Sequence, residues 1–164
     1  MDRLVVSSEE FSPVLHEILA SGGYVSLVVS GSSMRPFLKD GRDIVCLRTC
    51  TEKDLRSGQI LLFKRPDRPL ILHRIRRVLS DGRLIMNGDA QTWCETISFD
   101  QVIAVVSSVE RKGHHISSNC IWFRLWSLLW YPTRPVRPVL IKLGQQGRSL
   151  VRMWSENHKA TQER

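Results

Sequence analysis

A serine-containing segment near the start of the chain has residue types that could carry out covalent chemistry. Residues 30–36 read SGSSMRP, which places Ser33 shortly after a glycine at the end of an apolar run. A serine hydroxyl is a weak nucleophile unless a neighbouring base removes its proton, so the fold would have to bring a base to this serine. An imidazole, with an ordinary pKa of about 6.5, can do this near neutral pH, whereas a lysine at about 10.4 must first be desolvated. Taken alone, serines beside glycine are commonly loop residues.

Three further segments accompany this one along the chain. They are residues 55–63 (LRSGQILLF), 72–75 (LHRI) and 87–91 (NGDAQ). Together with residues 30–36 they resemble, in the same order, four motifs of the type I signal peptidases and of their relatives, the self-cleaving SOS-type repressors. The resemblance covers about residues 24–110. It implies a small, mainly β, antiparallel domain of the signal-peptidase and SOS-repressor type, with serine peptidase activity.

The resemblance also implies roles for individual residues. Ser33 is the expected nucleophile, and its backbone N–H is the family's main donor to the oxyanion. His73 lies where archaeal and endoplasmic-reticulum forms carry a histidine base, and a histidine can work in a wetter site than a lysine. The carboxylate that orients this histidine would be Asp89, in the Gly-Asp turn, or Glu95, six residues later. Asp89 is favoured because its motif match is the better one. No cofactor and no metal is expected.

Two positions depart from the family pattern. The Gly-Asp after the nucleophile turn reads Gly41-Arg42-Asp43 here, and the Gly-Asp after Leu55 reads Gly58-Gln59. Both are scaffold positions, so they weaken the likeness to housekeeping signal peptidases more than they weaken the case for catalysis. The first departure, a short N-terminal helix and a Trp-rich basic tail are similar to a compact bacterial subgroup of these peptidases that lacks the N-terminal membrane anchor.

The rest of the pattern predicts the elements that must position these residues. Ser7 and Glu10 have the spacing of a capping box, and apolar residues then recur at helical intervals, which predicts a helix over residues 8–20. Strand-like runs separated by turn signals follow, so a mostly antiparallel β domain is expected over about residues 24–113. The predicted strands are residues 24–29, 43–47, 59–63, 70–78, 83–86 and 102–110.

Residues 121–131 predict an amphipathic helical tail. The segment is almost wholly apolar, with Trp122, Trp126 and Trp130 four residues apart on one stripe, and Pro132 ends it. Such a helix is about 16 Å long, too short to cross a bilayer but long enough to lie in its surface. Aromatic residues at helical spacing usually face a protein core, so a helix that only covers the β domain is the alternative.

The charge of the chain divides in the same region. Residues 1–110 contain 14 Lys or Arg and 14 Asp or Glu, whereas residues 111–164 contain 10 and 2. The whole excess of +8 therefore lies in the last third, which favours an anionic membrane surface as a partner. The tryptophan stripe and basic residues such as Arg134 and Arg137 would contact that surface. Nucleic-acid binding is not expected, because no helix-turn-helix and no base-stacking sheet is recognisable.

Two parts are thus expected, a catalytic domain over residues 1–113 and a basic, Trp-rich membrane-interfacial tail over residues 114–164. The four cysteines fit neither a CxxC pair nor a zinc-site spacing. No apolar run approaches the roughly 18 residues that a membrane span needs. We therefore expect reduced cysteines, no transmembrane helix and a peripheral position on the cell membrane, at its cytoplasmic face.

The most specific hypothesis is a signal-peptidase-like serine endopeptidase. This hydrolase would cleave a precursor or leader peptide with Ser33 and His73, at or near the membrane. A self-cleaving regulator is disfavoured, because residues 1–23 are too few for a DNA-binding domain. A catalytically inactive module that binds a membrane surface stays open, because motifs can outlive activity.

Overall fold

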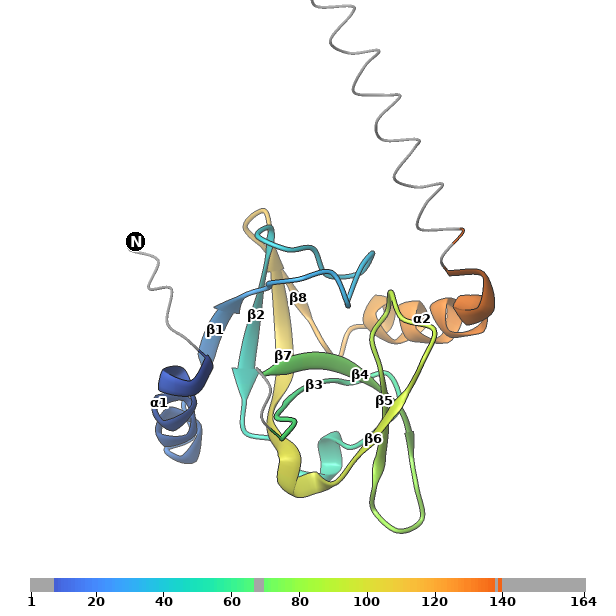
Figure 1. The fold of residues 1–164 in the computed structure, drawn as a ribbon. Coiled ribbons are helices and arrows are strands. Elements are labelled where there is room, and N and C mark those ends of the chain that lie inside the picture. The colour runs from blue at the N-terminus through green and yellow to red at the C-terminus, as the bar shows by residue number, and fades with distance from the viewer. Residues whose placement is uncertain (1–7, 67–69, 138, 140–164) are drawn as a thin grey trace, which may run out of the picture.

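One antiparallel sheet of eight strands forms the centre of the described part of the molecule (Figure 1). The computed structural model describes residues 8–66, 70–137 and 139 of the 164-residue chain. The strands pair in the order β1-β2-β7-β3-β4-β5-β6, and β8 also pairs with β7. They are β1 (Val25–Val28), β2 (Asp43–Arg48), β3 (Ile60–Phe63), β4 (Ile71–Val78), β5 (Leu84–Asn87), β6 (Glu95–Ile97), β7 (Val102–Arg111) and β8 (His114–Ser117).

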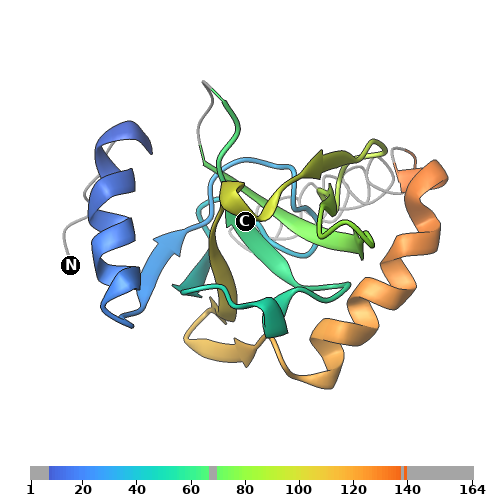
Figure 2. The same ribbon diagram turned by 90° about the horizontal axis from the view of Figure 1, so that it is seen from below.

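Two α-helices lie at opposite ends of this sheet (Figure 2). Helix α1 is Ser8–Ala20 and helix α2 is Ile121–Trp130. Short 3-10 helices at η1 (Glu52–Asp54), η2 (Phe99–Gln101) and η3 (Tyr131–Val136) complete the described elements. The predicted mainly β, antiparallel architecture with a helix near each end is therefore confirmed.

Two strands, β6 and β8, are not predicted from the sequence, and β8 lies just beyond the expected boundary at residue 113. Strand β8 begins at His114 and pairs with β7 through Ser117↔Ser108 and Ile116↔Val109. A division after residue 113 would cut this hairpin at its turn. In the described residues, the start of the expected tail is a part of the sheet, and α2 follows it directly.

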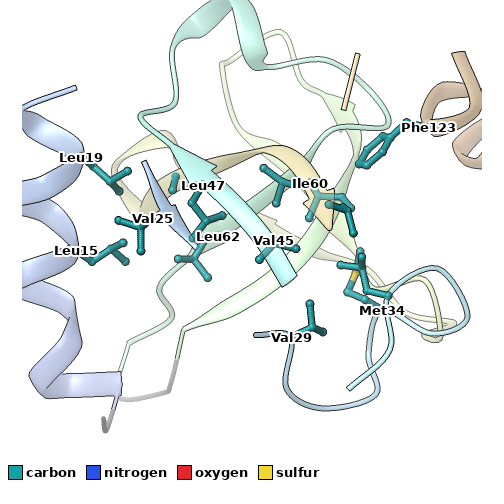
Figure 3. Close-up of a cluster of buried hydrophobic side chains, with 14 residues drawn as sticks. Leu15, Leu19, Val25, Val29, Met34, Val45, Leu47, Ile60, Leu62 and Phe123 are labelled. Carbon is teal, nitrogen blue, oxygen red and sulfur yellow. The ribbon is translucent and has the colours of Figure 1, made fainter. Parts of the chain in front are cut away.

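The sheet has an apolar core on each of its faces, because successive residues of a strand point to opposite sides. Every residue of β3 is buried for this reason. Ile60 and Leu62 belong to the larger cluster, which Leu15 and Leu19 of α1 and Phe123 of α2 help to close (Figure 3). The second cluster includes Leu61, Phe63, Ile75, Leu84, Met86, Ile97 and Val105.

The same alternation separates two neighbouring residues of β4. His73 pairs with Leu61 and its ring contacts Phe63, so it faces the second cluster. Arg74 pairs with Ile60 and its guanidinium lies over Phe37, so it faces the larger cluster. The expected base and the arginine beside it therefore occupy opposite faces of the sheet.

Candidate active site

The expected base is fixed by a carboxylate on its own side of the sheet. His73 is 1% exposed, and its Nδ1 lies 2.8 Å from Glu95 Oε1 at the start of the edge strand β6. Arg65 in turn donates from Nε and Nη2 to the two oxygens of Glu95, each at 2.5 Å. With Glu95 accepting the Nδ1 proton, the lone pair of the imidazole is at Nε2. This tautomer is the one that a general base needs.

Burial keeps this imidazole neutral at physiological pH. Desolvation lowers the pKa of His73 below its ordinary value of 6.5, because the imidazolium loses its hydration. The negative charge and hydrogen bond of Glu95 act in the opposite direction, and the positive charge of Arg65 adds to the lowering. His73 is therefore available as a proton acceptor at pH 7.

Asp89, which the motif match favours as the partner of His73, pairs with an arginine instead. Its two oxygens accept hydrogen bonds from Nε and Nη2 of Arg74, at 3.0 and 2.8 Å. The Asp89 side chain is 4% exposed, and the structure shows no hydrogen bond between it and His73 within the described residues. The preference for Asp89 over Glu95 is therefore corrected: Asp89 serves the arginine on the larger-cluster face, and Glu95 contacts the histidine.

The expected nucleophile lies in the loop that joins β1 to β2. Ser33 is half-buried, and its carbonyl oxygen accepts a 2.8 Å hydrogen bond from the backbone N–H of Ala90. A Cβ at Gly88 would meet this carbonyl oxygen at 2.8 Å and Gln91 Oε1 at 2.7 Å. The glycine of the Asn-Gly-Asp sequence is thus required by the close approach of the serine loop.

Ser33 and His73 are not joined directly in this structure. Among the described residues, no hydrogen bond connects the Ser33 hydroxyl to the His73 ring, and none is donated by the Ser33 backbone N–H. Hydrogen bonds of catalytic residues in proteins without substrate are often long and tighten only in the complex. The structure thus brings His73 and Glu95 together, and it brings the Ser33 backbone to the turn that contains Asp89.

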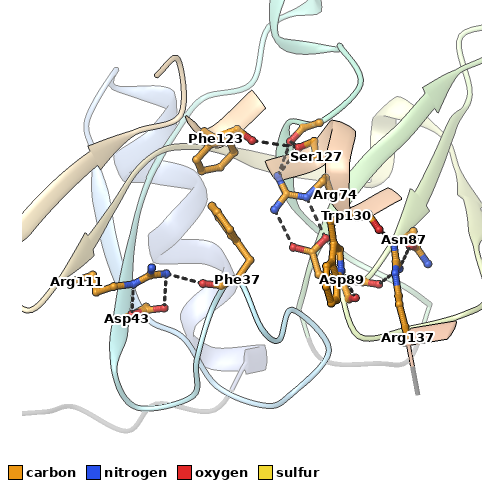
Figure 4. A network of polar contacts seen from close by, with 12 residues as sticks. Phe37, Asp43, Arg74, Asn87, Asp89, Arg111, Phe123, Ser127, Trp130 and Arg137 are labelled. Atoms are coloured by element: carbon orange, nitrogen blue, oxygen red, sulfur yellow. Dashed lines mark hydrogen bonds and ion pairs between the residues drawn. The ribbon is translucent and has the colours of Figure 1, made fainter. Parts of the chain in front are cut away.

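A buried ion cluster anchors the serine loop at its far end. Asp43 is fully buried and accepts hydrogen bonds from Arg111 (Figure 4). It also accepts hydrogen bonds from the Arg42 side chain and, at 3.0 Å, from the backbone N–H of Lys39. Burial opposes ionisation, but these hydrogen bonds outweigh it and lower the pKa of Asp43 to about 2. Arg111 also donates to the Phe37 carbonyl, at 2.5 Å. The Gly41-Arg42-Asp43 sequence therefore holds the loop in place.

Helix α2 packs on the same loop. The Phe37 ring meets Phe123 edge-on, with centroids 5.0 Å apart (Figure 4). The Phe37 ring also lies 5.6 Å from the Trp126 ring. Trp130 stacks on Trp126 at 5.2 Å and donates from Nε1 to the Asp89 carbonyl at 2.7 Å. Two of the three predicted membrane tryptophans are thus half-buried, because their rings cover the serine loop and the Asp89 turn.

A basic residue of the expected tail is also internal. Arg137 is 2% exposed and donates from Nη1 to Asn87 Oδ1 at 2.6 Å and to the Gln91 carbonyl at 2.8 Å. Its guanidinium lies 5.7 Å from the Trp130 ring. Arg137 is therefore a structural part of the site's surroundings and cannot contact a membrane, contrary to the sequence-based expectation.

A cavity of about 290 Å³ lies between α2 and strands β4 and β5. Arg74, Arg76 and Arg77 line it, together with Asp89 and Leu128. Neither Ser33 nor His73 does, so this cavity is not the cleft in which a scissile peptide would meet these two residues.

Two residues in the surroundings of His73 are not predicted by the sequence motifs. Arg65 follows β3 by two residues and holds Glu95, and Trp93 meets the His73 ring edge-on at 6.2 Å. Arg65 also lies over the Trp93 ring, at 5.5 Å. Neither residue falls inside one of the four motifs, and the pairing that brings them to His73 is non-local.

Comparison of the chain with protein-family models, with curated proteins and with solved structures finds no match. Within the described residues, no helix is both long enough and apolar enough to cross a membrane.

Proposed function

We propose that this protein is a serine endopeptidase of the signal-peptidase type that cleaves a precursor or leader peptide. Ser33 is the nucleophile, His73 the general base and Glu95 the residue that orients the base. The observation that carries the proposal is the buried His73 with its Nδ1 on Glu95 and its Nε2 without a hydrogen bond to any described residue. A neutral imidazole that is oriented by a hydrogen bond at Nδ1 and has a free lone pair at Nε2 is suited to accept a proton.

The reaction follows from these roles. His73 Nε2 takes the proton of the Ser33 hydroxyl as Oγ attacks the scissile carbonyl carbon, and the Ser33 N–H donates to the oxyanion. The tetrahedral intermediate collapses, the peptide C–N bond breaks, and the imidazolium gives its proton to the leaving amine. Water then attacks the ester with His73 again as the base, which releases the acid and restores the serine. The mechanism requires the Ser33 hydroxyl to reach His73 Nε2 in the peptide complex.

Covalent labelling tests the nucleophile without knowledge of the substrate. We expect an alkyl fluorophosphonate to modify the full chain at Ser33, as mapped by mass spectrometry of its tryptic peptides. The label should be lost in both Ser33→Ala and His73→Ala, and kept in the control Ser32→Ala, which changes the exposed neighbouring hydroxyl. Labelling of Ser32 in place of Ser33 would contradict the assignment.

Cleavage is tested on a proteome-derived peptide library, with new N-termini identified by mass spectrometry. The wild-type chain should produce cleavages that Ser33→Ala does not. The intact mass of the purified chain distinguishes the self-cleaving regulator, because self-cleavage at an internal bond would shorten it in the wild type only. A wild-type chain that neither takes the label nor cuts any peptide would be an inactive module, and the peptidase proposal would fail.

A further inference from the structure

Helix α2 has an apolar face that the rest of the described molecule leaves uncovered. Except for Arg124 and Ser127, every residue of the helix is apolar. The inner face, with Phe123, Trp126 and Trp130, packs on the serine loop and the Asp89 turn. On the other face the side chains are 67 to 75% exposed, namely Ile121, Trp122, Leu128 and Leu129.

Helical spacing gathers these exposed residues on one side. Positions 121 and 128, like positions 122 and 129, are seven residues or about two helical turns apart, so the four residues form two adjacent rows on the side away from the buried Phe123. In Figure 2, α2 runs along one side of the molecule, with the sheet on its inner side only. Single exposed apolar residues are normal on a protein surface, but four of them on one helix face are not.

The surroundings of this face are basic. The cavity beside Leu128 is lined by Arg76 and by the exposed Arg77. Its only acidic lining residue is Asp89, which is paired with Arg74. Helix α2 contains no acid. In the sequence beyond the described part, residues 140–164 carry five Lys or Arg against two Glu. An apolar stripe with a basic border matches the chemistry of an anionic lipid surface.

We propose that the outer face of α2, residues Ile121, Trp122, Leu128 and Leu129, binds the surface of an anionic phospholipid bilayer. Trp122 lies at the level of the headgroups, and Leu128 and Leu129 insert at the boundary with the acyl chains. The helix lies in the plane of the surface, because its buried face must stay on the protein. This surface replaces the Trp122, Trp126 and Trp130 stripe expected from the sequence, and it does not depend on peptidase activity.

Sedimentation with vesicles tests the proposal on the full chain. Vesicles of equal parts phosphatidylglycerol and phosphatidylcholine should bind the protein, with binding weakened by salt and by omission of phosphatidylglycerol. Leu128→Ser/Leu129→Ser should weaken the binding by at least about tenfold. The matched control, Val14→Ser/Ile18→Ser, changes exposed apolar residues on α1 at the opposite side of the molecule and should leave binding unchanged. Ser33→Ala should also bind normally, which separates this surface from the proposed chemistry.

Tryptophan fluorescence identifies the residue that enters the bilayer. With bromine-labelled acyl chains in the vesicles, quenching should be largely lost in Trp122→Phe and retained in Trp126→Phe. Retained quenching in Trp122→Phe, or normal binding by Leu128→Ser/Leu129→Ser, would overturn the assignment of this face. A wild-type chain that ignores the vesicles but forms a dimer that the same double variant dissociates would show that a second copy covers the face.

Discussion

His73 and Arg74 are adjacent on β4, and each contacts a carboxylate on its own side of the sheet. Arg74 uses Nε and Nη2 on Asp89, and its Nη1 contacts the Gly58 carbonyl and Ser127 Oγ. His73 uses only Nδ1, on Glu95. Both side chains are buried beside a carboxylate, so burial and pairing do not distinguish a structural group from a catalytic one. The difference is in how many of their nitrogen atoms are hydrogen-bonded. All three side-chain nitrogens of Arg74 have partners, whereas His73 Nε2 has none among the described residues and can accept a proton.

The largest effect on stability should come from breaking the ion pair between Arg74 and Asp89. Asp89→Asn removes the charge that compensates the buried Arg74 guanidinium, and such a loss costs about 3–5 kcal/mol of unfolding free energy. The measurement is equilibrium unfolding in urea. The comparison variant is Asp81→Asn, whose ion pair with Arg83 is about half exposed and which should leave stability unchanged. Equal losses in the two variants would mean that Asp89 is not a structural anchor.

The pair of His73 and Glu95 should respond mainly in activity. Glu95→Gln keeps the shape of the side chain but no longer favours the Nδ1–H tautomer, so kcat for a cleaved library peptide should fall roughly 100-fold or more. KM should change little, because Glu95 acts through His73 and not on the peptide. Glu110→Gln is the matched control, since Glu110 lies 4.0 Å from the exposed His115. A rise in KM with an unchanged kcat would contradict an orienting role.

The pH dependence of both activity and stability follows from His73. Its folded-state pKa is lowered by burial, so between that value and 6.5 the unfolded chain binds more protons than the folded protein. The free energy of unfolding should therefore decrease as the pH falls below 6.5 towards the folded-state pKa. The acid limb of kcat/KM should lie below 6.5 and move lower still in Glu95→Gln, because Glu95 favours the imidazolium.

Two measurements check this behaviour. Urea unfolding across the pH range should lose this decrease in His73→Gln and keep it in the control His115→Gln, whose ring is exposed. Stability that increases on acidification would show that Glu95 outweighs burial. An activity limb near the ordinary pKa of lysine, about 10, would point to a lysine as the base.

Local patterns in the sequence were enough for most elements but not for the choice between the two carboxylates. The helix over residues 8–20 and six of the strands follow from periodicity and turn signals, which act over a few residues. The alternation along β4 already places His73 and Arg74 on opposite faces. Which face Asp89 reaches depends on the turn after β5 and on its contact with Ser33, and that contact is non-local.

The C-terminal helix shows a second kind of limit. Because α2 is apolar almost all round, helical spacing alone does not decide which stripe is buried. The spacing predicts that the tryptophan stripe faces the membrane, whereas the Trp126 ring packs on Phe37 and Trp130 donates a hydrogen bond to the Asp89 carbonyl. Arg137 is similar, since its burial depends on Asn87, fifty residues earlier in the chain.

The smallest effect should come from removing the contact between α2 and Arg74. Ser127 Oγ accepts a 3.0 Å hydrogen bond from Arg74 Nη1, which also keeps its 2.8 Å bond to the Gly58 carbonyl. Ser127→Ala therefore removes one neutral partner of a donor that stays bonded, and the loss should be about 1 kcal/mol of unfolding free energy. The control Ser57→Ala, with its exposed hydroxyl on the Arg76 carbonyl, should be close to neutral. If Ser127→Ala were as costly as Asp89→Asn, α2 and not the carboxylate would hold Arg74 in place.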